Sequence, residues 1–202
     1  MSEPLIWDVV VIGAGAAGML AAARAAQRGA KTLLLEKNRK LGVKILISGG
    51  TRCNITHDAD APGIAAAFPK RQRQFLRSAL AALPPHRLLE LFRQQGVHTK
   101  VEETGKVFPI SDRAIDVRDA LVRTLNASGC VIRNEAAVQS IHPQHDRFQI
   151  DLADGPVMGR QIVIACGGQS YPGCGTTGDG YQWTRQLGHQ IVDPVPASAP
   201  LR

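Results

Sequence analysis

Three glycines near the start of the chain have the spacing of a phosphate-binding turn. Gly13, Gly15 and Gly18 follow an uninterrupted apolar run, Val9–Ile12, and lead into an alanine-rich stretch. In such a turn the first glycine allows a sharp bend and the second lets a pyrophosphate approach the backbone. The third lets the helix pack close to the strand. The spacing therefore predicts a dinucleotide-binding strand, turn and helix.

The residues around these glycines suit the same site. Ala14, Ala16 and Ala17 are small, and free N–H groups at a helix start attract a dianionic pyrophosphate with the positive end of the helix dipole. Glu36 ends a second apolar run 18 residues after the third glycine, where a carboxylate can accept hydrogen bonds from both ribose hydroxyls. A parallel strand is therefore expected before this acid.

The identity of the dinucleotide stays open at this point. Glu36 would repel a ribose 2′-phosphate, but Lys37, Arg39 and Lys40 follow it directly, so charge alone does not exclude such a phosphate. The glycine motif itself does not separate FAD from NAD.

A second glycine-rich loop, over residues 41–54, also has the character of a ligand-binding loop. Gly49 and Gly50 let the backbone come close to a ligand. Hydrogen-bonding side chains flank them at Ser48, Thr51, Arg52 and Asn54. Cys53 in this loop could be a catalytic thiol or a small packing residue, and we prefer the packing interpretation.

A third glycine pair follows a predicted parallel strand, Gln161–Ala165, in the run Cys166-Gly167-Gly168. Asp179 comes next in a TTGDG segment, where it is placed to cap a last helix. A simple NAD site would not need two additional glycine loops. The three loops together therefore favour FAD.

The rest of the pattern predicts an α/β fold. Two short helices are expected between Pro69 and Gly96, then a hairpin over Val97–Ile110. A helix over Asp112–Ser128, with Ser111 or Asp112 as its N-cap, leads to a third parallel strand at Cys130–Arg133. Turn signals separate three short strands that predict an antiparallel meander, namely Val138–Ile141, Phe148–Leu152 and a strand from Val157 onward.

Composition limits the class of protein. The 202 residues are 44% hydrophobic and 20% charged, which is ordinary for one globular core and unlike a disordered or fibrous chain. No apolar stretch has the length of a membrane span, and the N-terminus does not resemble a signal peptide, so a cytoplasmic protein is expected. The 4 cysteines form no CxxC pair and no metal-ligand spacing with the 6 histidines, which predicts reduced thiols and no metal site.

The charge balance raises the question of a polyanionic partner. Net charge is +7, and the segment between Ala61 and Leu89 has no acid. Its cations are Lys70, Arg71, Arg73, Arg77 and Arg87. Such a patch could contact nucleic acid or an anionic substrate, but aromatic residues for base stacking are few. A solvated helix face is the preferred interpretation, and nucleic-acid binding is not expected.

Several motifs together carry a family resemblance. The first βαβ unit, ISGGTRCNIT, GKVFPISDRA, VIACGG and YPGCGTTGDGY resemble the BaiN-like (YhiN-type) FAD-dependent oxidoreductases, within the glutathione-reductase-like flavoproteins. This family includes aminoacetone-oxidase-family proteins and dehydro-bile-acid reductases. The likeness runs from about Asp8 to Pro200. It implies a Rossmann-like FAD-binding domain, a parallel sheet with an inserted antiparallel β-meander.

The resemblance also implies a role for each loop. Gly13–Gly18 would hold the FAD pyrophosphate and Glu36 the adenosine ribose, with Lys37 beside it. Lys44 and the Ser48–Asn54 loop would meet the flavin side. Val138 would meet the adenine through its backbone, Ala165–Gly168 would line the ADP-ribityl portion, and Asp179 completes the cofactor-binding set. Mild departures from the family pattern occur at Cys166, Lys106 and Cys174.

Family members are longer, with a substrate or capping domain and a closing segment over the flavin. We therefore expect residues 1–192 to be an incomplete FAD-binding domain and 193–202 to be a proline-rich linker toward a missing domain. The resemblance implies hydride transfer through the flavin from NAD(P)H to a small unsaturated or carbonyl substrate. No catalytic side chain can be named. The alternatives are a non-catalytic FAD-binding fragment and a flavin-dependent tRNA-modifying protein.

Overall fold

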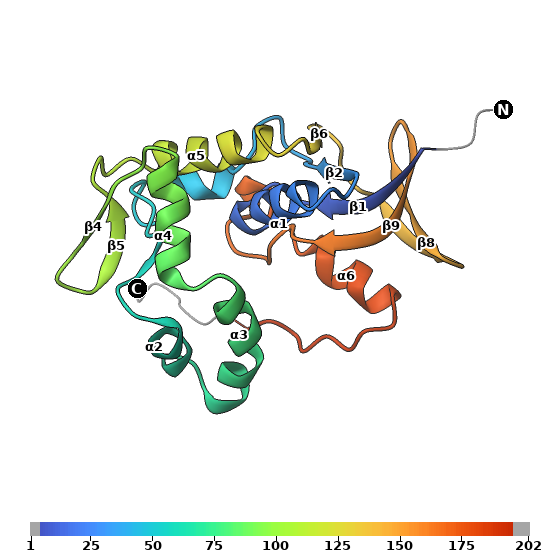
Figure 1. Ribbon diagram of the computed structural model, residues 1–202. Helices are drawn as coiled ribbons and strands as arrows, with labels where there is room; N and C mark the ends of the chain where they lie inside the picture. The colour runs from blue at the N-terminus through green and yellow to red at the C-terminus, as the bar shows by residue number, and fades with distance from the viewer. Residues whose placement is uncertain (1–4, 196–202) are drawn as a thin grey trace.

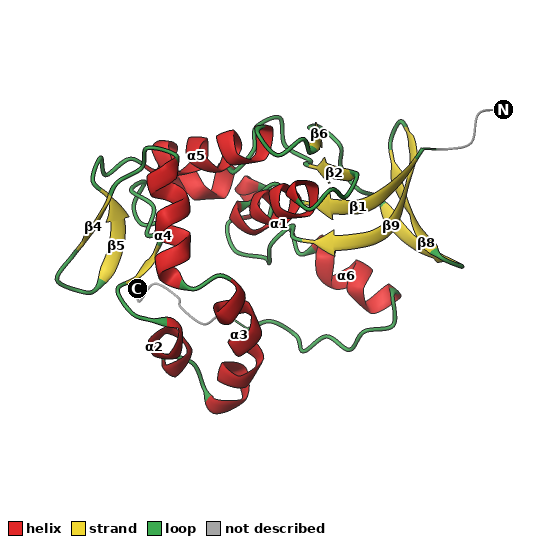
Figure 2. Cartoon of the chain, viewed as in Figure 1, coloured by secondary structure: helices red, strands yellow, loops and turns green. Residues whose placement is uncertain are grey.

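The central sheet has six strands in the order β6-β2-β1-β9-β8-β7. A computed structural model describes residues 5–195, and Figures 1 and 2 show how the elements are arranged. The strand bounds are β1 Ile6–Ile12, β2 Thr32–Leu35, β6 Val131–Arg133, β7 Ser140–Gln144, β8 Arg147–Leu152 and β9 Gly155–Ile164. β6, β2, β1 and the second half of β9 are parallel, and β8 and β7 add an antiparallel meander. The predicted Rossmann-like fold with an inserted meander is confirmed.

β9 is one continuous strand that serves both parts of the sheet. Its first half pairs antiparallel with β8, and its second half pairs parallel with β1. The sequence predicted two separate elements here, a meander strand from Val157 and a parallel strand over Gln161–Ala165. That division was wrong because nothing between them turns the chain. Gly159 instead lies where an added Cβ would come 2.7 Å from Val10 Cγ2, so it serves close packing between strands.

Helices and a small second sheet complete the described chain. The helices are α1 Ala16–Gln27, α2 Ala61–Ala66, α3 Lys70–Ala82, α4 Pro85–Gln94, α5 Ala114–Asn126 and α6 Asp179–Gln186. Two 3-10 turns are η1 Val43–Ile47 and η2 Pro172–Cys174. The second sheet is antiparallel, in the order β3-β5-β4, from β3 Thr56–His57, β5 Lys106–Pro109 and β4 Thr99–Val101. Within residues 5–195 no helix combines the length and hydropathy that crossing a membrane requires.

The core lies on both faces of the parallel strands. Val11 of β1 packs into a buried cluster with α1 and α5, whereas Val10 and Ile12 face a second cluster formed with the meander and Trp183 of α6. This two-sided burial explains why the strand has no alternation of polar and apolar residues. The carboxyl ends of β2, β1 and β9 consequently lie side by side at the same end of the sheet.

Most of the other predicted elements are confirmed, and two helix starts differ. The two helices after Pro69, the hairpin and the third parallel strand are present. Asp112 does not cap α5, because its carboxylate pairs with Lys100 and its backbone is left-handed, with φ 52°. Asp179 does not cap α6 either, since Gly178 occupies the N-cap position. Of the predicted linker 193–202, residues 196–202 lie outside the described residues.

Candidate cofactor site

The three glycines of the first turn do different work in the structure. Gly13 has a φ of 99°, and an added Cβ would come 2.6 Å from Cys166 Cα. At Gly18 an added Cβ would come 1.8 Å from the Gly13 carbonyl oxygen, so only glycine lets α1 pack this close to the turn. At Gly15 no atom lies within 4 Å of the added Cβ. The turn is therefore closed on its protein side and open beside Gly15.

The N-terminus of α1 opens into the same space. The helix has no side-chain cap and no acid in its first turn, and Ala16 and Ala17 are its first residues. The first N–H groups of a helix have no intrahelical partner and carry the positive end of the helix dipole. An anion beside Gly15 would satisfy these donors.

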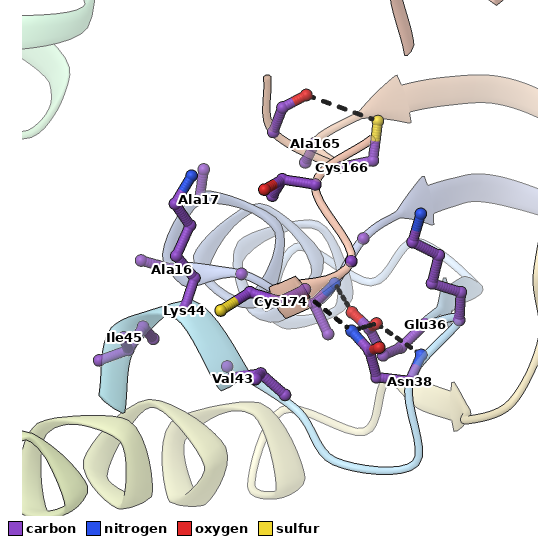
Figure 3. A pocket seen from close by; sticks show the side chains of 18 of the residues that line it. Ala16, Ala17, Glu36, Asn38, Val43, Lys44, Ile45, Ala165, Cys166 and Cys174 are labelled. Atoms are coloured by element: carbon purple, nitrogen blue, oxygen red, sulfur yellow. Dashed lines mark hydrogen bonds between the residues drawn. The ribbon is translucent and has the colours of Figure 1, made fainter. Parts of the chain in front are cut away.

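Glu36 links the end of β2 to the turn. Its side chain is buried, with 7% exposed, and its Oε2 accepts a hydrogen bond of 2.7 Å from the Ala14 N–H. Its Oε1 accepts from the backbone N–H and from Nδ2 of Asn38, each at 2.8 Å, as Figure 3 shows. A carboxylate has about four acceptor positions, so these three bonds leave room for a ribose hydroxyl. Glu36 therefore also holds the turn in place, a role beyond the predicted ribose contact.

Three hydrogen bonds join the segment from the end of β9 to the start of α6 with the residues that follow β2. Lys37 Nζ donates to Asp179 Oδ2 at 2.9 Å and to Thr177 Oγ1 at 2.8 Å, and Asn38 Nδ2 donates to the Cys174 carbonyl at 3.3 Å. Burial raises the pKa of the Asp179 carboxyl, but the hydrogen bonds from Lys37 and Thr177 outweigh it and the net pKa is lowered. Lys37 is thereby neutralised by an acid rather than left facing a phosphate.

Lys44, which precedes the glycine pair of the second loop, also contacts the segment between β9 and α6. Its Nζ donates to the carbonyl oxygen of Ser170 at 2.8 Å and to Ser170 Oγ at 2.9 Å. The ammonium also lies 5.9 Å from the centre of the Tyr171 ring. These partners are uncharged, so no acid among them offsets the charge of Lys44.

These elements enclose a groove of about 950 Å³ along the carboxyl ends of β2, β1 and β9. Ligands of doubly wound sheets bind at this edge. The predicted residues that line the groove are Gly13, Ala14, Gly15, Ala16, Ala17, Glu36, Lys37, Lys44, Ser48, Cys53, Asn54, Val138, Ala165, Cys166, Gly167 and Asp179. Gly18, Gly49, Gly50, Arg52 and Gly168 are not among its lining residues. A single continuous groove thus joins all three glycine loops.

Comparison with known proteins identifies the family. Residues 7–195 match the family described as HI0933-like protein Rossmann domain. The chain belongs to this family.

Three curated relatives of the HI0933-like chain carry names of two kinds. Ribosomal RNA dihydrouridine synthase of Escherichia coli is 34% identical over 92% of this chain and 46% of that protein. The protein of the same name from Haemophilus influenzae is 30% identical over 95% of this chain and 48% of its own length. 3-dehydro-bile acid delta(4,6)-reductase of Clostridium scindens is 30% identical over 95% and 46% respectively. The chain spans about half the length of these relatives.

A solved structure supports the fold. THI4 of Thermovibrio ammonificans superposes with a TM-score of 0.58 at 13% identity, covering 92% of this chain and 64% of that one. At this identity the likeness concerns the arrangement of strands and helices alone.

Arg52 of this HI0933-like chain points away from the groove. Its Nη1 lies 2.5 Å from Glu102 Oε1 and 3.6 Å from Asp112 Oδ1, and its guanidinium lies 4.1 Å from the centre of the Phe108 ring. Arg52 therefore fastens the second glycine loop to the small sheet. The sequence placed it at the flavin side because it could not show which way the side chain turns.

Cys53 lies in the same loop in a strained, left-handed backbone conformation, with φ 64°. Its thiol is buried, and burial raises the pKa against an opposing hydrogen bond with Ser48. A protonated thiol is a poor nucleophile. The structure therefore supports the packing interpretation, at a position that also lines the groove.

Several lining residues were missed by the sequence interpretation. The groove is also lined by Asn38, Ala136, Ala137, Gln139, Cys174, Gly175, Thr176, Thr177, Gln182 and Trp183. The TTGD cluster gave a signal for the threonines. No sequence pattern indicated that Gln182 and Trp183 line the groove, because both residues are typical of an ordinary helix.

Proposed function

We propose that this chain holds FAD and forms the cofactor-binding part of a flavin-dependent oxidoreductase. The observation that carries the proposal is the single groove whose lining includes Val138 and Trp183, the open side of Gly15, and Ser48 and Asn54. A dinucleotide would use these surfaces for its base, for its pyrophosphate at an uncapped helix N-terminus, and for its second ring system.

The residues of the groove suit the successive parts of FAD. The N–H groups of α1 would meet the pyrophosphate, and the remaining acceptor position of Glu36 would meet the adenosine ribose. Lys44 and the loop at Ser48–Asn54 would meet the flavin side. Bound FAD would supply hydride-transfer chemistry, and the chain would bind, orient and shield it.

For the whole protein we propose reduction of a double bond conjugated to a carbonyl group, with NAD(P)H as the hydride source. Two kinds of names among the relatives support this chemistry: a dihydrouridine synthase and a delta(4,6)-reductase both describe saturation of a carbon–carbon bond. A small unsaturated substrate agrees with the bile-acid name.

A second candidate substrate is RNA. Two relatives, at 34% and 30% identity, are named for ribosomal RNA, and this gives the nucleic-acid alternative a support that the sequence alone did not. The two candidates share the flavin site and differ in what approaches it.

The decisive experiment concerns the cofactor. Purified protein should be yellow, release FAD on denaturation, and rebind FAD more tightly than NAD(H) in a fluorescence titration. Anaerobic addition of NADH or NADPH should then bleach the flavin. A colourless protein that binds NAD(H) alone would refute the proposal, and detection of dihydrouridine in RNA treated with the protein would decide between the substrates.

A further inference from the structure

Helices α2 and α3 form a projecting arm, which we call the α2–α3 arm and define as residues 61–83. Figure 1 shows the two helices extending from the start of α4, away from the central sheet. Within the arm only Ala65 is buried, and no residue of the 13-residue helix α3 is buried. A helix of a folded domain ordinarily buries one apolar stripe. The arm therefore presents nearly all of its surface to solvent or to a partner.

The outward face of α3 contains an exposed aromatic residue. Leu76 and Leu80 are half-buried and mark the packed side of the helix, which contacts α2. At 3.6 residues per turn, Arg71, Gln74 and Phe75 fall on the opposite side. The Phe75 side chain is 85% exposed, one turn after Arg71 on the same face. An aromatic ring in this position contributes little to the core.

Three cations of α3 have no acidic partner. Among the ion pairs of residues 5–195, none involves Lys70, Arg71 or Arg77. Arg73 differs, because its Nη2 donates to the carbonyl oxygens of Ala66 at 3.0 Å and Phe68 at 3.3 Å and so fixes α3 to the end of α2. Three cations of α3 thus remain free: Arg71 lies on the face of Phe75, whereas Lys70 and Arg77 fall about 140° and about 160° around the helix from that ring.

We propose that the α2–α3 arm binds single-stranded RNA that crosses the exposed side of α3, with a base stacked on Phe75, one phosphate at Arg71, and further phosphates at Lys70 and Arg77 on the other flank. Single-strand binders combine unpaired cations that follow the nucleic-acid backbone with an aromatic ring that stacks on bases. A solvated helix face explains the cations but not the exposed ring. The proposal rests on the RNA candidate named under the proposed function, and its surface is separate from the FAD groove.

The charge half of the proposal is tested with a fluorescently labelled, uridine-rich RNA, titrated with the 202-residue chain at several salt concentrations. In K70Q/R71Q/R77Q the slope of log affinity against log salt should fall by about 2, because each lost phosphate contact contributes about 0.7. Affinity should fall at least about tenfold at physiological salt. The matched control R24Q/R28Q/K31Q removes the same charge at the far end of α1 and should leave the slope unchanged.

The aromatic half is tested at one position. Phe75→Leu should weaken RNA binding by about tenfold through loss of stacking, and Phe75→Trp should restore it. FAD binding, measured on each preparation, should equal that of the wild type. Wild-type RNA binding by both arm variants would overturn the proposal, as would binding to vesicles of phosphatidylcholine and phosphatidylserine without binding to RNA. Loss of FAD binding in the wild type would instead refute the proposed function and leave the arm untouched.

Discussion

Two glycines of the first turn allow ligand binding and fold stability to be separated. Gly15 faces open groove, whereas Gly18 is in contact with the backbone of the turn. We predict that Gly15→Ala weakens FAD binding with little effect on the folded apoprotein, and that Gly18→Ala destabilises the fold itself. Both substitutions add the same methyl group, so any difference between them reports its surroundings.

The expected magnitudes follow from those surroundings. Gly15 has an extended backbone, with φ −74°, which alanine also adopts. A weaker N-cap costs up to about 1 kcal/mol, and the reduced freedom of the unfolded chain returns a similar amount. If the methyl group displaces the pyrophosphate from one N–H group, a loss of about 1.5–3 kcal/mol corresponds to about a ten- to hundredfold weaker FAD complex.

At Gly18 the added methyl carbon would come 1.8 Å from a carbonyl oxygen, so α1 must move away from β1. Overpacking costs about 3 kcal/mol at its upper end, and the better helix propensity of alanine offsets about 1 kcal/mol. A net loss of about 2 kcal/mol lowers Tm by about 4–8 °C in a chain of this size.

Thermal unfolding of the apoprotein and titration with FAD measure the two effects separately. Gly173→Ala is the control, because its Cβ would meet no atom within 4 Å and it does not line the groove. If Gly15→Ala bound FAD like the wild type, the pyrophosphate would not lie over Gly15. An unchanged Tm in Gly18→Ala would show that close packing does not require glycine there.

Three further predictions concern one contact in the groove and two residues outside its lining. Asp179→Asn should lower Tm by removing the ion pair with Lys37. Because the pKa of Asp179 is lowered in the folded protein, this pair stabilises the fold at neutral pH. The difference in Tm between the variant and the wild type should therefore vanish as pH falls below the ordinary range of an aspartate. Burial raises the pKa of Cys130 to about 11, so alkylation followed by mass spectrometry should be slow at neutral pH and accelerate as pH approaches that value; fast alkylation at neutral pH in folded protein would contradict this. Arg52→Lys should lower Tm by weakening the contacts with Glu102 and Phe108 while the FAD dissociation constant stays unchanged, whereas a loss of affinity at unchanged Tm would place Arg52 at the flavin instead.

The sequence predicted the parts of the site that depend on local chain geometry. Some features can be recognised within a short segment: a glycine with positive φ, a helix start without an acid, and an acid at the end of a buried strand. Gly13 and Glu36 could therefore be found from spacing. Contacts between distant segments have no such local sequence pattern. Asn38 meets Cys174 across 136 residues, and only the sheet order brings the two together. Side-chain direction is equally invisible, so the sequence could not show that Arg52 contacts Glu102 and Phe108.

The charged side chains that line the groove explain how a dianion could bind there without a basic pocket. In the described chain they are Glu36, Lys37, Lys44 and Asp179, and Lys37 and Asp179 pair with each other. Glu36 accepts hydrogen bonds from the N–H groups of Ala14 and Asn38, which leaves Lys44 as the unpaired cation of the groove. A pyrophosphate would therefore be bound mainly by the fixed dipoles of α1, which salt screens weakly in a partly buried site. The free cations of the α2–α3 arm lie in solvent, where screening is strong. The two surfaces thus suit different ligands: a cofactor held by preset backbone geometry, and a polyanion attracted by mobile surface charge.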